Sequence, residues 1–597
     1  MRASAQDGRY PRPQLLRPRW VDLGGEWEFD VDDGSPSLER VRGARRFPRT
    51  IVVPYPPEAP LSGIGDTGYH PVVWYRRRVS TDDLAAAGFT GDGRLLVHLG
   101  AVDYRADVWA GGIHVGHHEG GHTPFTVDVT DAATGAFDLV VRAEDDPLDL
   151  EQPRGKQDWE PDPHVIWYHR TTGIWQPVWL EAVARQHVAH LQWRPDAAAA
   201  RVGLHVELAH APEPGTAVRV VVEHGDQRLA EVTAIVGHQR GEVSVPLGVL
   251  RNGQDYERFL WSPERPVLLD AHVTVLSPEG DEVDTVHSYF GLRSVGVAGA
   301  RFLLNDRPYP VRAVLSQGYW PQSHLAAPSA EALRDEVQLI KDLGFTTARL
   351  HQKIEDPRFL FWADRLGLLV WEELPSAYEF SATAGERLTR EWLEAMRRDA
   401  SHPCIAVWVP FNESWGVQQV ASDERQQHLV RSLFHLTKAL DGTRLVVSND
   451  GWEHLDSDLL TVHDYENDAA VLEASYATTS AIAETVSGIG PGRRRMFVLP
   501  VDETPSIVGA PVVVSEFGGV SLEADPEGGT WGYRVVATSA ELERQLRALF
   551  GALNASPAIA GWCYTQLTDT AQETNGLADE KRVPKLPAEV IRAMVRG

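Results

Sequence analysis

Two segments of the chain determine its expected fold, AVWVPFNESWG at residues 406–416 and APVVVSEFGGV at residues 510–520. In each segment a mostly apolar run leads to a glutamate, Glu413 in the first and Glu516 in the second. Continuous apolar runs are typical of parallel strands that are buried on both faces. A barrel of alternating strands and helices carries its functional side chains at the carboxyl ends of its strands. We therefore expect both glutamates to meet at one barrel mouth.

The alternative for each glutamate is a strand-terminal residue in a surface ion pair. Two such residues, about 100 positions apart, favour a shared active site over two unrelated ion pairs. Asn412 directly before Glu413 and the Phe517–Gly519 segment after Glu516 strengthen this interpretation.

The region around these segments, residues 296–597, alternates strand patterns with helix patterns. In AEALRDEVQLIKDLG at 330–344, for example, apolar residues recur at helical spacing and a glycine supplies the stop. Eight strands are expected, at 311–317, 346–350, 368–373, 405–412, 444–448, 459–463, 511–515 and 558–564. Eight strands with intervening helices predict a C-terminal (β/α)8 TIM barrel.

The first half of the chain reads as β-structure throughout. Residues 1–185 contain short β runs separated by turn residues, such as WVDLGGEWEFD at 20–30 and FDLVVRAEDD at 137–146, and predict a β-sandwich. Residues 186–295 hold a second set of evenly spaced β runs, which predicts an immunoglobulin-like β-sandwich. The expected chain is therefore multidomain, with two sandwiches before the barrel.

Composition excludes several classes of partner. The formal net charge of -27 repels phosphate backbones and anionic lipid, so we expect neither nucleic acid nor a membrane as partner. Two cysteines are too few for a disulfide framework, and no apolar stretch is long enough to span a membrane. We expect a soluble, cytoplasmic protein, and leave open whether it forms a homo-oligomer.

Taken together, the motifs resemble glycoside hydrolase family 2, the family of β-galactosidases, β-glucuronidases and β-mannosidases. In the first domain WYRRRV at 74–79 and TTGIWQPVWLE at 171–181 are similar to its sugar-binding jelly-roll sandwich. In the barrel the similar segments are FLLNDRPYPVRAV at 302–314, TARLH at 347–351, DRLGLLVWEELP at 364–375, HPCIAVWVPFNESWG at 402–416 and VVVSEFGG at 512–519. The resemblance implies an exo-acting retaining β-glycosidase that needs no cofactor, with Glu413 as general acid/base and Glu516 as nucleophile.

The local sequence is compatible with these two roles. A retaining pair needs carboxyl groups about 5–5.5 Å apart, whereas an inverting pair needs about 6.5–9.5 Å, and the sequence leaves both alternatives open. Trp408 and Trp415 flank Glu413, and we expect a dry setting to raise its pKa. Hydrogen-bond donors around Glu516 are expected to keep it ionised.

Further polar residues are expected at the same mouth. Asn412 would bind the 2-hydroxyl of the sugar or else cap a following helix. By resemblance Tyr465 touches the nucleophile, and the alternative is a tyrosine packed under a loop. Arg349 is expected to pair with carboxylates and orient the nucleophile. The remaining candidates are His463, His351, Glu372, Glu373, Asn449, Asp450 and Trp562, the last of which would stack on the sugar or simply pack in the barrel.

A long first-domain loop, GKQDWEPDPHVIWYHRTTGIW at 155–175, is expected by family analogy to reach over the barrel. It would wall the pocket and bring sugar contacts from Lys156, Asp158, Trp159 or Trp167. The alternative is a solvent-exposed excursion or a subunit contact.

Departures from the family pattern bear on the substrate. The Asn-x-Lys pair of β-glucuronidases is missing from QETNGLADEKRVPK at 572–585, which disfavours a glucuronide. WEELPSAYEF at 371–380 replaces the metal-binding Glu and His of large β-galactosidases, so we expect no metal. A β-galactoside is favoured, with a β-galactofuranoside or arabinoside next. The non-enzymatic alternative is a carbohydrate-binding protein with an inactive barrel.

Overall fold

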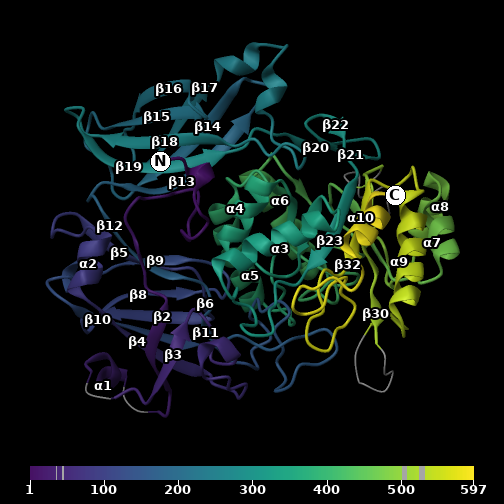
Figure 1. The fold of residues 1–597 in the computed structure, drawn as a ribbon, viewed down its shortest axis with the longest axis horizontal. Coiled ribbons are helices and arrows are strands. Elements are labelled where there is room, and N and C mark those ends of the chain that lie inside the picture. The colour runs from purple at the N-terminus through teal and green to yellow at the C-terminus, as the bar shows by residue number, and fades with distance from the viewer. Residues whose placement is uncertain (35–36, 44–45, 500–506, 508, 524–531) are drawn as a thin grey trace.

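The computed structural model describes residues 1–597 except 35–36, 44–45, 500–506, 508 and 524–531. Two β-sandwiches lie along one side of the molecule and pack against a C-terminal barrel (Figure 1). The multidomain architecture predicted from the sequence is confirmed. The predicted boundaries near 185 and 295 fall between β12 and β13 and at the start of β20, and they stay a prediction.

The first sandwich is a jelly roll of two facing sheets. The larger sheet has the order β3-β2-β4-β10-β7-β8 and the smaller one β1-β12-β5-β9. Their buried faces meet in one core, to which Trp27, Tyr75, Val97 and Leu180 contribute. The strands are β1 Val21–Asp22, β2 Gly25–Val31, β3 Arg49–Val53, β4 Val72–Val79, β5 Arg94–Leu99, β7 Arg105–Ala110, β8 Ile113–Glu119, β9 Phe125–Asp128, β10 Phe137–Glu144 and β12 Val178–Val183.

The second sandwich is immunoglobulin-like, with a three-stranded sheet β13-β14-β17 facing a four-stranded sheet β16-β15-β18-β19. Alternating apolar residues of both sheets, such as Val218, Val220 and Val222 of β15, form its core. Its strands are β13 Val188–Asp196, β14 Arg201–Leu208, β15 Ala217–His224, β16 Gln227–Ile235, β17 Arg240–Pro246, β18 Leu269–Leu276 and β19 Glu282–Phe290.

The barrel sheet has eight parallel strands in the order β27-β26-β25-β24-β23-β32-β29-β28. Side chains link the end strands β27 and β28 through the residues that flank them: Asp458, before β28, accepts from the Val446 amide at 2.8 Å, and Thr461 of β28 accepts at 3.1 Å from the amide of Gly451, after β27. The strands are β23 Val311–Ser316, β24 Thr347–Leu350, β25 Leu369–Glu373, β26 Ile405–Val409, β27 Leu445–Val446, β28 Leu460–Asp464, β29 Val512–Gly518 and β32 Gly561–Thr565. A small sheet of β20 Val295–Ala298, β21 Arg301–Leu304 and β22 Arg307–Pro308 leads into the barrel.

Helices follow most of the barrel strands. Helix α3 shows why they form: Ser329 accepts from the Ala332 amide as N-cap, and Leu333, Val337 and Ile340 bury one face. The barrel helices are α3 Ala330–Asp342, α4 Pro357–Leu366, α5 Ala382–Asp399, α6 Glu424–Leu440, α7 Ala469–Tyr476, α8 Thr479–Thr485, α9 Ser539–Asn554 and α10 Ala588–Arg596.

All eight predicted barrel strands are present, but two ends differ where the chain carries chemistry. The strand predicted at 405–412 ends at Val409, because Pro410 has no amide hydrogen to donate and Glu413 adopts a left-handed φ of 53°. The strand predicted at 511–515 instead continues to Gly518 with a register shift, in which Val462 pairs with Val514 but His463 pairs with Glu516. Such a bulge re-aims side chains.

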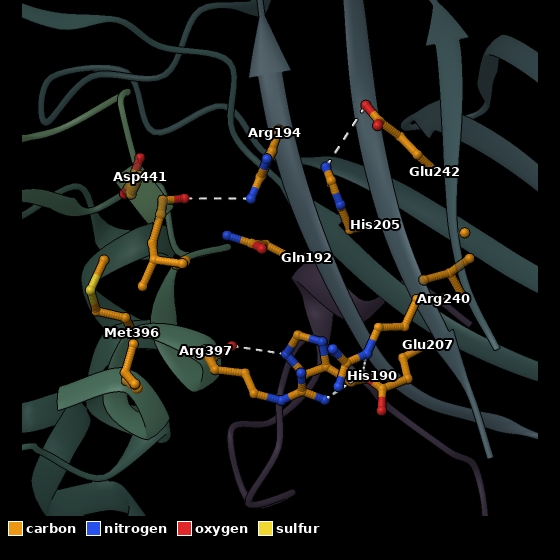
Figure 2. Close-up of a pocket in the computed structure, with 15 residues that line it drawn as sticks. His190, Gln192, Arg194, His205, Glu207, Arg240, Glu242, Met396, Arg397 and Asp441 are labelled. Atoms are coloured by element: carbon orange, nitrogen blue, oxygen red, sulfur yellow. Dashed lines mark hydrogen bonds and ion pairs between the residues drawn. The ribbon is translucent and has the colours of Figure 1, made fainter. Parts of the chain in front are cut away.

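A cavity of about 630 Å³ marks the junction of the second sandwich with the barrel helices (Figure 2). Arg397 of α5 and Arg240 of β17 both donate to the Glu207 carboxylate, at 2.8 and 3.0 Å. His190 donates to the backbone oxygen of Arg397 at 2.8 Å. These bonds fix the barrel against the second sandwich.

Cys404 and Cys563 are both buried and free. Within the described residues, none of the helices combines the length and apolar character that crossing a bilayer requires.

We predict that Gly518→Ala destabilises the protein, whereas Gly551→Ala does not. Gly518 has φ +92° and an added Cβ would collide with the Tyr564 ring, so strain and overpacking should cost at least about 2 kcal/mol. Gly551 lies in α9 with open space around it, so alanine should stabilise that helix by up to about 1 kcal/mol. Denaturant unfolding of both variants tests this, and equal effects would contradict the packing described for β29.

Candidate active site

Glu413 lies on a tight turn after β26. Glu413 and Ser414 have φ values of 53° and 59°, and the turn is held by backbone and side-chain bonds from the segment after β27. The Glu413 amide donates to the Asp450 carbonyl at 3.0 Å, and the Ser414 amide donates to the Asn449 side-chain oxygen at 3.0 Å. The strained turn is therefore fixed by two adjacent residues of one segment, and it directs the Glu413 side chain toward His463.

Glu516 sits in the bulge of β29 and is held by two donors. Arg349 donates from Nη1 to Oε1 at 2.7 Å, and the Tyr465 hydroxyl donates to Oε2. These two bonds fix both carboxylate oxygens in position.

Arg349 connects the carboxylates of the mouth. It is fully buried and donates to Glu373 Oε2 at 2.9 Å and to Asn412 Oδ1 at 2.7 Å, while Asp450 Oδ2 lies 2.9 Å from Nη2. One guanidinium thus joins residues from four different strand ends.

Asn412 keeps one group for a ligand. Its side-chain oxygen accepts from Arg349, but within the described part of the chain its amide nitrogen has no hydrogen-bond partner. The following helix α6 begins only at Glu424, so Asn412 does not cap it.

His463 lies between the two glutamates. Its Nδ1 is 2.7 Å from Glu413 Oε1, while Nε2 is 3.1 Å from Asp450 Oδ2 and 3.5 Å from Glu516 Oε1. One carboxylate oxygen of Glu413, one of Glu516 and a ring nitrogen of His463 all lie within 4.8 Å of one another. The two glutamates therefore face a common space.

The prediction that the pKa of Glu413 is raised was wrong. Burial disfavours the Glu413 carboxylate, but the hydrogen bond and charge of His463 and the charge of Lys156 outweigh burial, so the pKa of Glu413 is lowered rather than raised. Trp408 does not dry Glu413, because its indole donates to Asp441 on the helix side of the barrel. Trp415 instead packs at the mouth against Trp167.

The pKa values of other titratable groups in the mouth are also shifted, some upward and some downward. Burial raises the pKa of Glu373 to about 7 against the opposing charge of Arg349. His351, 3.1 Å from Glu373, has its pKa lowered by burial and by the charges of Arg349 and Lys156. Burial opposes ionisation of Asp450, but Arg349 and His463 lower its pKa.

The 155–175 loop reaches the barrel mouth. The Gly155 amide donates to the Ser376 carbonyl at 3.0 Å, and Gln572 donates to the Trp167 carbonyl at 2.8 Å. The Trp167 ring lies 5.6 Å from the Trp415 ring, centroid to centroid, edge on. The loop therefore forms one wall beside Glu413.

Two models of one protein family match this chain. The model described as "Glycosyl hydrolases family 2" matches residues 186–293, and "Glycosyl hydrolases family 2, TIM barrel domain" matches residues 295–482. The chain belongs to glycoside hydrolase family 2.

Relatives and solved structures of the family agree with this. The chain is 25% identical over 402 residues to a β-galactosidase of Thermoanaerobacter pseudethanolicus and over 419 residues to a β-glucuronidase of Rattus norvegicus. These alignments cover 66% and 64% of this chain but only 50% and 60% of the relatives, so the chain spans half to three fifths of their length.

Two solved structures share the fold over the whole chain. A family 2 β-galacturonidase from Eisenbergiella tayi bound to glycerol has a TM-score of 0.74 at 19% identity and covers 98% of this chain and 97% of its own. A β-glucuronidase from Bifidobacterium dentium complexed with coumarin-3-O-glucuronide has a TM-score of 0.75 at 19% identity and covers 98% of both chains. At such identities the likeness concerns the fold.

The candidate sugar-binding residues of the 155–175 loop differ in whether their polar groups are already bonded within the protein. Lys156 is 5% exposed, and within the described residues its ammonium has no hydrogen-bond or ion-pair partner. Asp158 is instead used inside the loop, where it accepts from the His164 amide and ring at 2.8 Å. Trp159 packs on Trp167 with ring centroids 4.9 Å apart. Lys156 is thus the charged residue among these candidates that has no hydrogen-bond or ion-pair partner in the described part of the chain, and its ammonium lies 5.7 Å from the centroid of the Tyr168 ring.

Three predicted contacts do not reach the mouth. Trp562 packs against Phe517 and Phe550 and donates to Asn554 of α9, so it belongs to the layer between barrel and helices rather than to a sugar platform. Glu372 is fully buried, and the charge of Asp399 in α5 together with burial raises its pKa. The side-chain amide of Asn449 donates to the Ser414 hydroxyl and to the Trp452 carbonyl, and so Asn449 supports the Glu413 turn.

Sequence reasoning missed two residues near the site. Glu573, after β32, is buried and accepts from the Tyr168 hydroxyl and from Asn575 at 3.0 Å. Tyr533 stacks on Tyr465 with ring centroids 3.4 Å apart. The position of Glu573 in the segment that follows the eighth strand was an available signal, whereas nothing in the sequence around Tyr533 points to the mouth.

Two groups of side chains come close enough together to raise the question of a metal. Asp364, His402 and Cys404 are buried, but Asp364 is already engaged by His402 at 2.6 Å and by the Cys404 amide at 2.9 Å. In the mouth both His463 nitrogens face carboxylates, and a histidine protonated on both nitrogens has no lone pair for a metal. In both of these groups of described residues, the possible ligand atoms are already used in hydrogen bonds within the chain.

We predict that Arg349→Met destabilises the barrel by about 3–5 kcal/mol, because it leaves the carboxylates of Glu373, Asp450 and Glu516 buried without their shared cation. Urea denaturation followed by tryptophan fluorescence measures the loss. The exposed Arg547, paired with Glu543 on α9, is the matched control, and Arg547→Met should change stability by less than about 1 kcal/mol. Equal stability of both variants would contradict the central role of Arg349.

Proposed function

We propose that the protein is a retaining, exo-acting β-glycosidase that hydrolyses a terminal non-reducing sugar by double displacement. Glu516 attacks the anomeric carbon and Glu413 protonates the leaving oxygen, after which Glu413 activates the hydrolytic water. The observation that carries the proposal is the pair of facing carboxylates, with Glu516 fixed by Arg349 and Tyr465.

The spacing supports retention over inversion. Oxygens of Glu413 and Glu516 within 4.8 Å of each other match the short separation of a nucleophilic pair. An inverting pair would need about 6.5–9.5 Å to admit a water molecule between carboxylate and sugar. The free amide nitrogen of Asn412 supports a bond to the 2-hydroxyl, which strengthens in the transition state. A purely carbohydrate-binding protein would not need both carboxylates aligned in this way.

An exo-acting enzyme is supported by the loop wall. The 155–175 loop closes the side of the mouth beside Trp415, and a pocket closed on one side suits a single terminal sugar.

A neutral sugar, β-galactoside first, suits the charges of the mouth. The carboxylates at least match the cations, so there is no surplus positive charge to hold a sugar carboxylate. The carboxylates are Glu373, Glu413, Asp450, Glu516 and Glu573, and the cations are Arg349, His463 and Lys156. A β-galactofuranoside or arabinoside is the next candidate, and the relative from Thermoanaerobacter pseudethanolicus is named a β-galactosidase.

One observation favours a second candidate, a uronide. The unpartnered ammonium of Lys156 is a donor that a sugar carboxylate would use, and the structural neighbours are a β-galacturonidase and β-glucuronidases. A screen of nitrophenyl β-galactoside, β-galactofuranoside, arabinoside, β-glucuronide and β-galacturonide separates the candidates. Turnover of the uronides alone would overturn the neutral-sugar proposal, and no turnover of any glycoside would count against a glycosidase.

We predict that Glu516→Ala abolishes hydrolysis of the best substrate and that azide restores turnover. A small anion can occupy the space of the deleted carboxylate and attack the anomeric carbon, which gives a glycosyl azide of inverted configuration. NMR of the product reads out the configuration. Near-normal turnover without azide would exclude Glu516 as the nucleophile.

We predict that Glu413→Ala slows substrates with poor leaving groups by about 10²–10⁴-fold but slows dinitrophenyl glycosides far less in the first step. Only a poor leaving group needs a proton as its bond breaks, so the two substrate series should diverge. Steady-state and burst kinetics on both series supply the test. A loss of the same size in both would rule out the acid role.

A further inference from the structure

The imidazole of His463 is enclosed by carboxylates. Glu413 Oε1 lies 2.7 Å from Nδ1, and Asp450 Oδ2 and Glu516 Oε1 lie 3.1 and 3.5 Å from Nε2. Gly451 leaves room for the ring, because a Cβ there would meet it at 2.8 Å. The side chain is 1% exposed, so water does not compete for either nitrogen.

Both ring nitrogens therefore carry a proton. A neutral imidazole would direct one lone pair at a carboxylate oxygen, which is repulsive, whereas an imidazolium donates from both nitrogens. Burial opposes the charge, but Glu516, Asp450 and Glu413 outweigh it and raise the pKa of His463 to about 10.

The other charged and titratable groups around this ring come from every neighbouring strand end. Arg349 of β24 shares Asp450 and Glu516 with it, and the pKa of His454, in the loop before β28, is lowered to about 4 by burial and in small part by the charge of His463. Lys156 of the loop and His351 at the end of β24 act on Glu413. Of the described cations, His463 is the one that bonds directly to Glu413 and also faces Glu516.

We propose that His463 stores the proton that Glu413 passes to the leaving group, so that acid/base catalysis belongs to a Glu413–His463 pair. The inference rests on the proposed function. His463 does not touch the sugar, and it acts through Glu413 as a positioning residue.

The proton is balanced over both steps. In the first, a Glu516 oxygen bonds to the anomeric carbon and the glycosidic bond breaks, while the His463 Nδ1 proton passes to the Glu413 carboxylate and from there to the leaving oxygen, which leaves Glu413 ionised and His463 neutral. In the second, water attacks the anomeric carbon, its proton returns through Glu413 to His463, and the bond to Glu516 breaks to give the carboxylate. The sum is hydrolysis with no other reactant.

The charge of Glu516 determines when His463 passes its proton to Glu413. While Glu516 is ionised, it holds the imidazolium from 3.5 Å away. When Glu516 becomes a neutral glycosyl ester, that attraction disappears in a buried setting where charges interact strongly. His463 then releases its proton at the moment when the leaving oxygen needs one.

The unmodified enzyme provides the first test. A dinitrophenyl 2-deoxy-2-fluoro glycoside of the best substrate traps the glycosyl-enzyme, and its leaving phenolate takes up no proton at neutral pH. In weakly buffered solution with a pH indicator, we expect about one proton released per burst of phenolate as His463 loses its anionic partner. A burst with no proton release from weakly acidic to alkaline pH overturns the inference, whereas no burst at all counts against the proposed function.

The second test uses His463→Gln, with His454→Gln as matched control. His454 is equally buried but bonds to the backbone oxygen of Thr461, 2.7 Å away. Wild type keeps the proton until His463 titrates, so its activity on poor leaving groups should persist to alkaline pH. In His463→Gln the proton must reside on a carboxyl group, and the basic limb of kcat/KM should move down by at least about 2 pH units.

The substrate series separates proton storage from structural damage. We expect His463→Gln to lose about 10²–10⁴-fold on poor leaving groups while the rate of the dinitrophenyl burst changes far less. His454→Gln should keep the wild-type basic limb even if it lowers stability. A His463→Gln profile with an unshifted basic limb, or the same loss on both series, overturns the inference.

Discussion

The mouth of this barrel depends on one buried guanidinium. Arg349 reaches Glu373, Asn412, Asp450 and Glu516, which come from four different strand ends. Without that cation, carboxylates this close in a buried space would repel one another or take up protons, and Glu516 would lose its fixed orientation. The barrel positions the residues, and the arginine makes their assembly stable as charged groups.

The two cations at the centre serve different purposes. An arginine cannot release its proton in a protein, so Arg349 supplies constant charge and geometry. A histidine can, so His463 responds to changes at its neighbours. This division explains why the pKa of Glu413 is lowered although it is proposed to act as an acid. The proton is held on Nδ1 of His463, which is hydrogen-bonded to Glu413 Oε1.

The sequence reveals the strands and the two glutamates because apolar runs and their final residues are local features. It does not reveal which face of a strand turns inward when a bulge changes the alternation. Trp562 faces the helices, whereas the charges of Arg349 and Glu516 act on its neighbour Cys563. The state of Glu413 was also mispredicted, since it depends on His463, 50 residues away in sequence, and on Lys156 from another domain.

The loop that carries Lys156 and Trp167 belongs to a domain that a ribosome makes before the strands that carry both glutamates. Domains generally fold as units in order of synthesis. A newly made barrel can therefore meet a first sandwich that has already folded, and its pocket lacks the wall formed by the 155–175 loop until the two have docked. The complete substrate-binding site therefore forms only after the first sandwich and the barrel have docked. In a chain whose first sandwich had failed to fold, the charged barrel mouth would be exposed to bulk water.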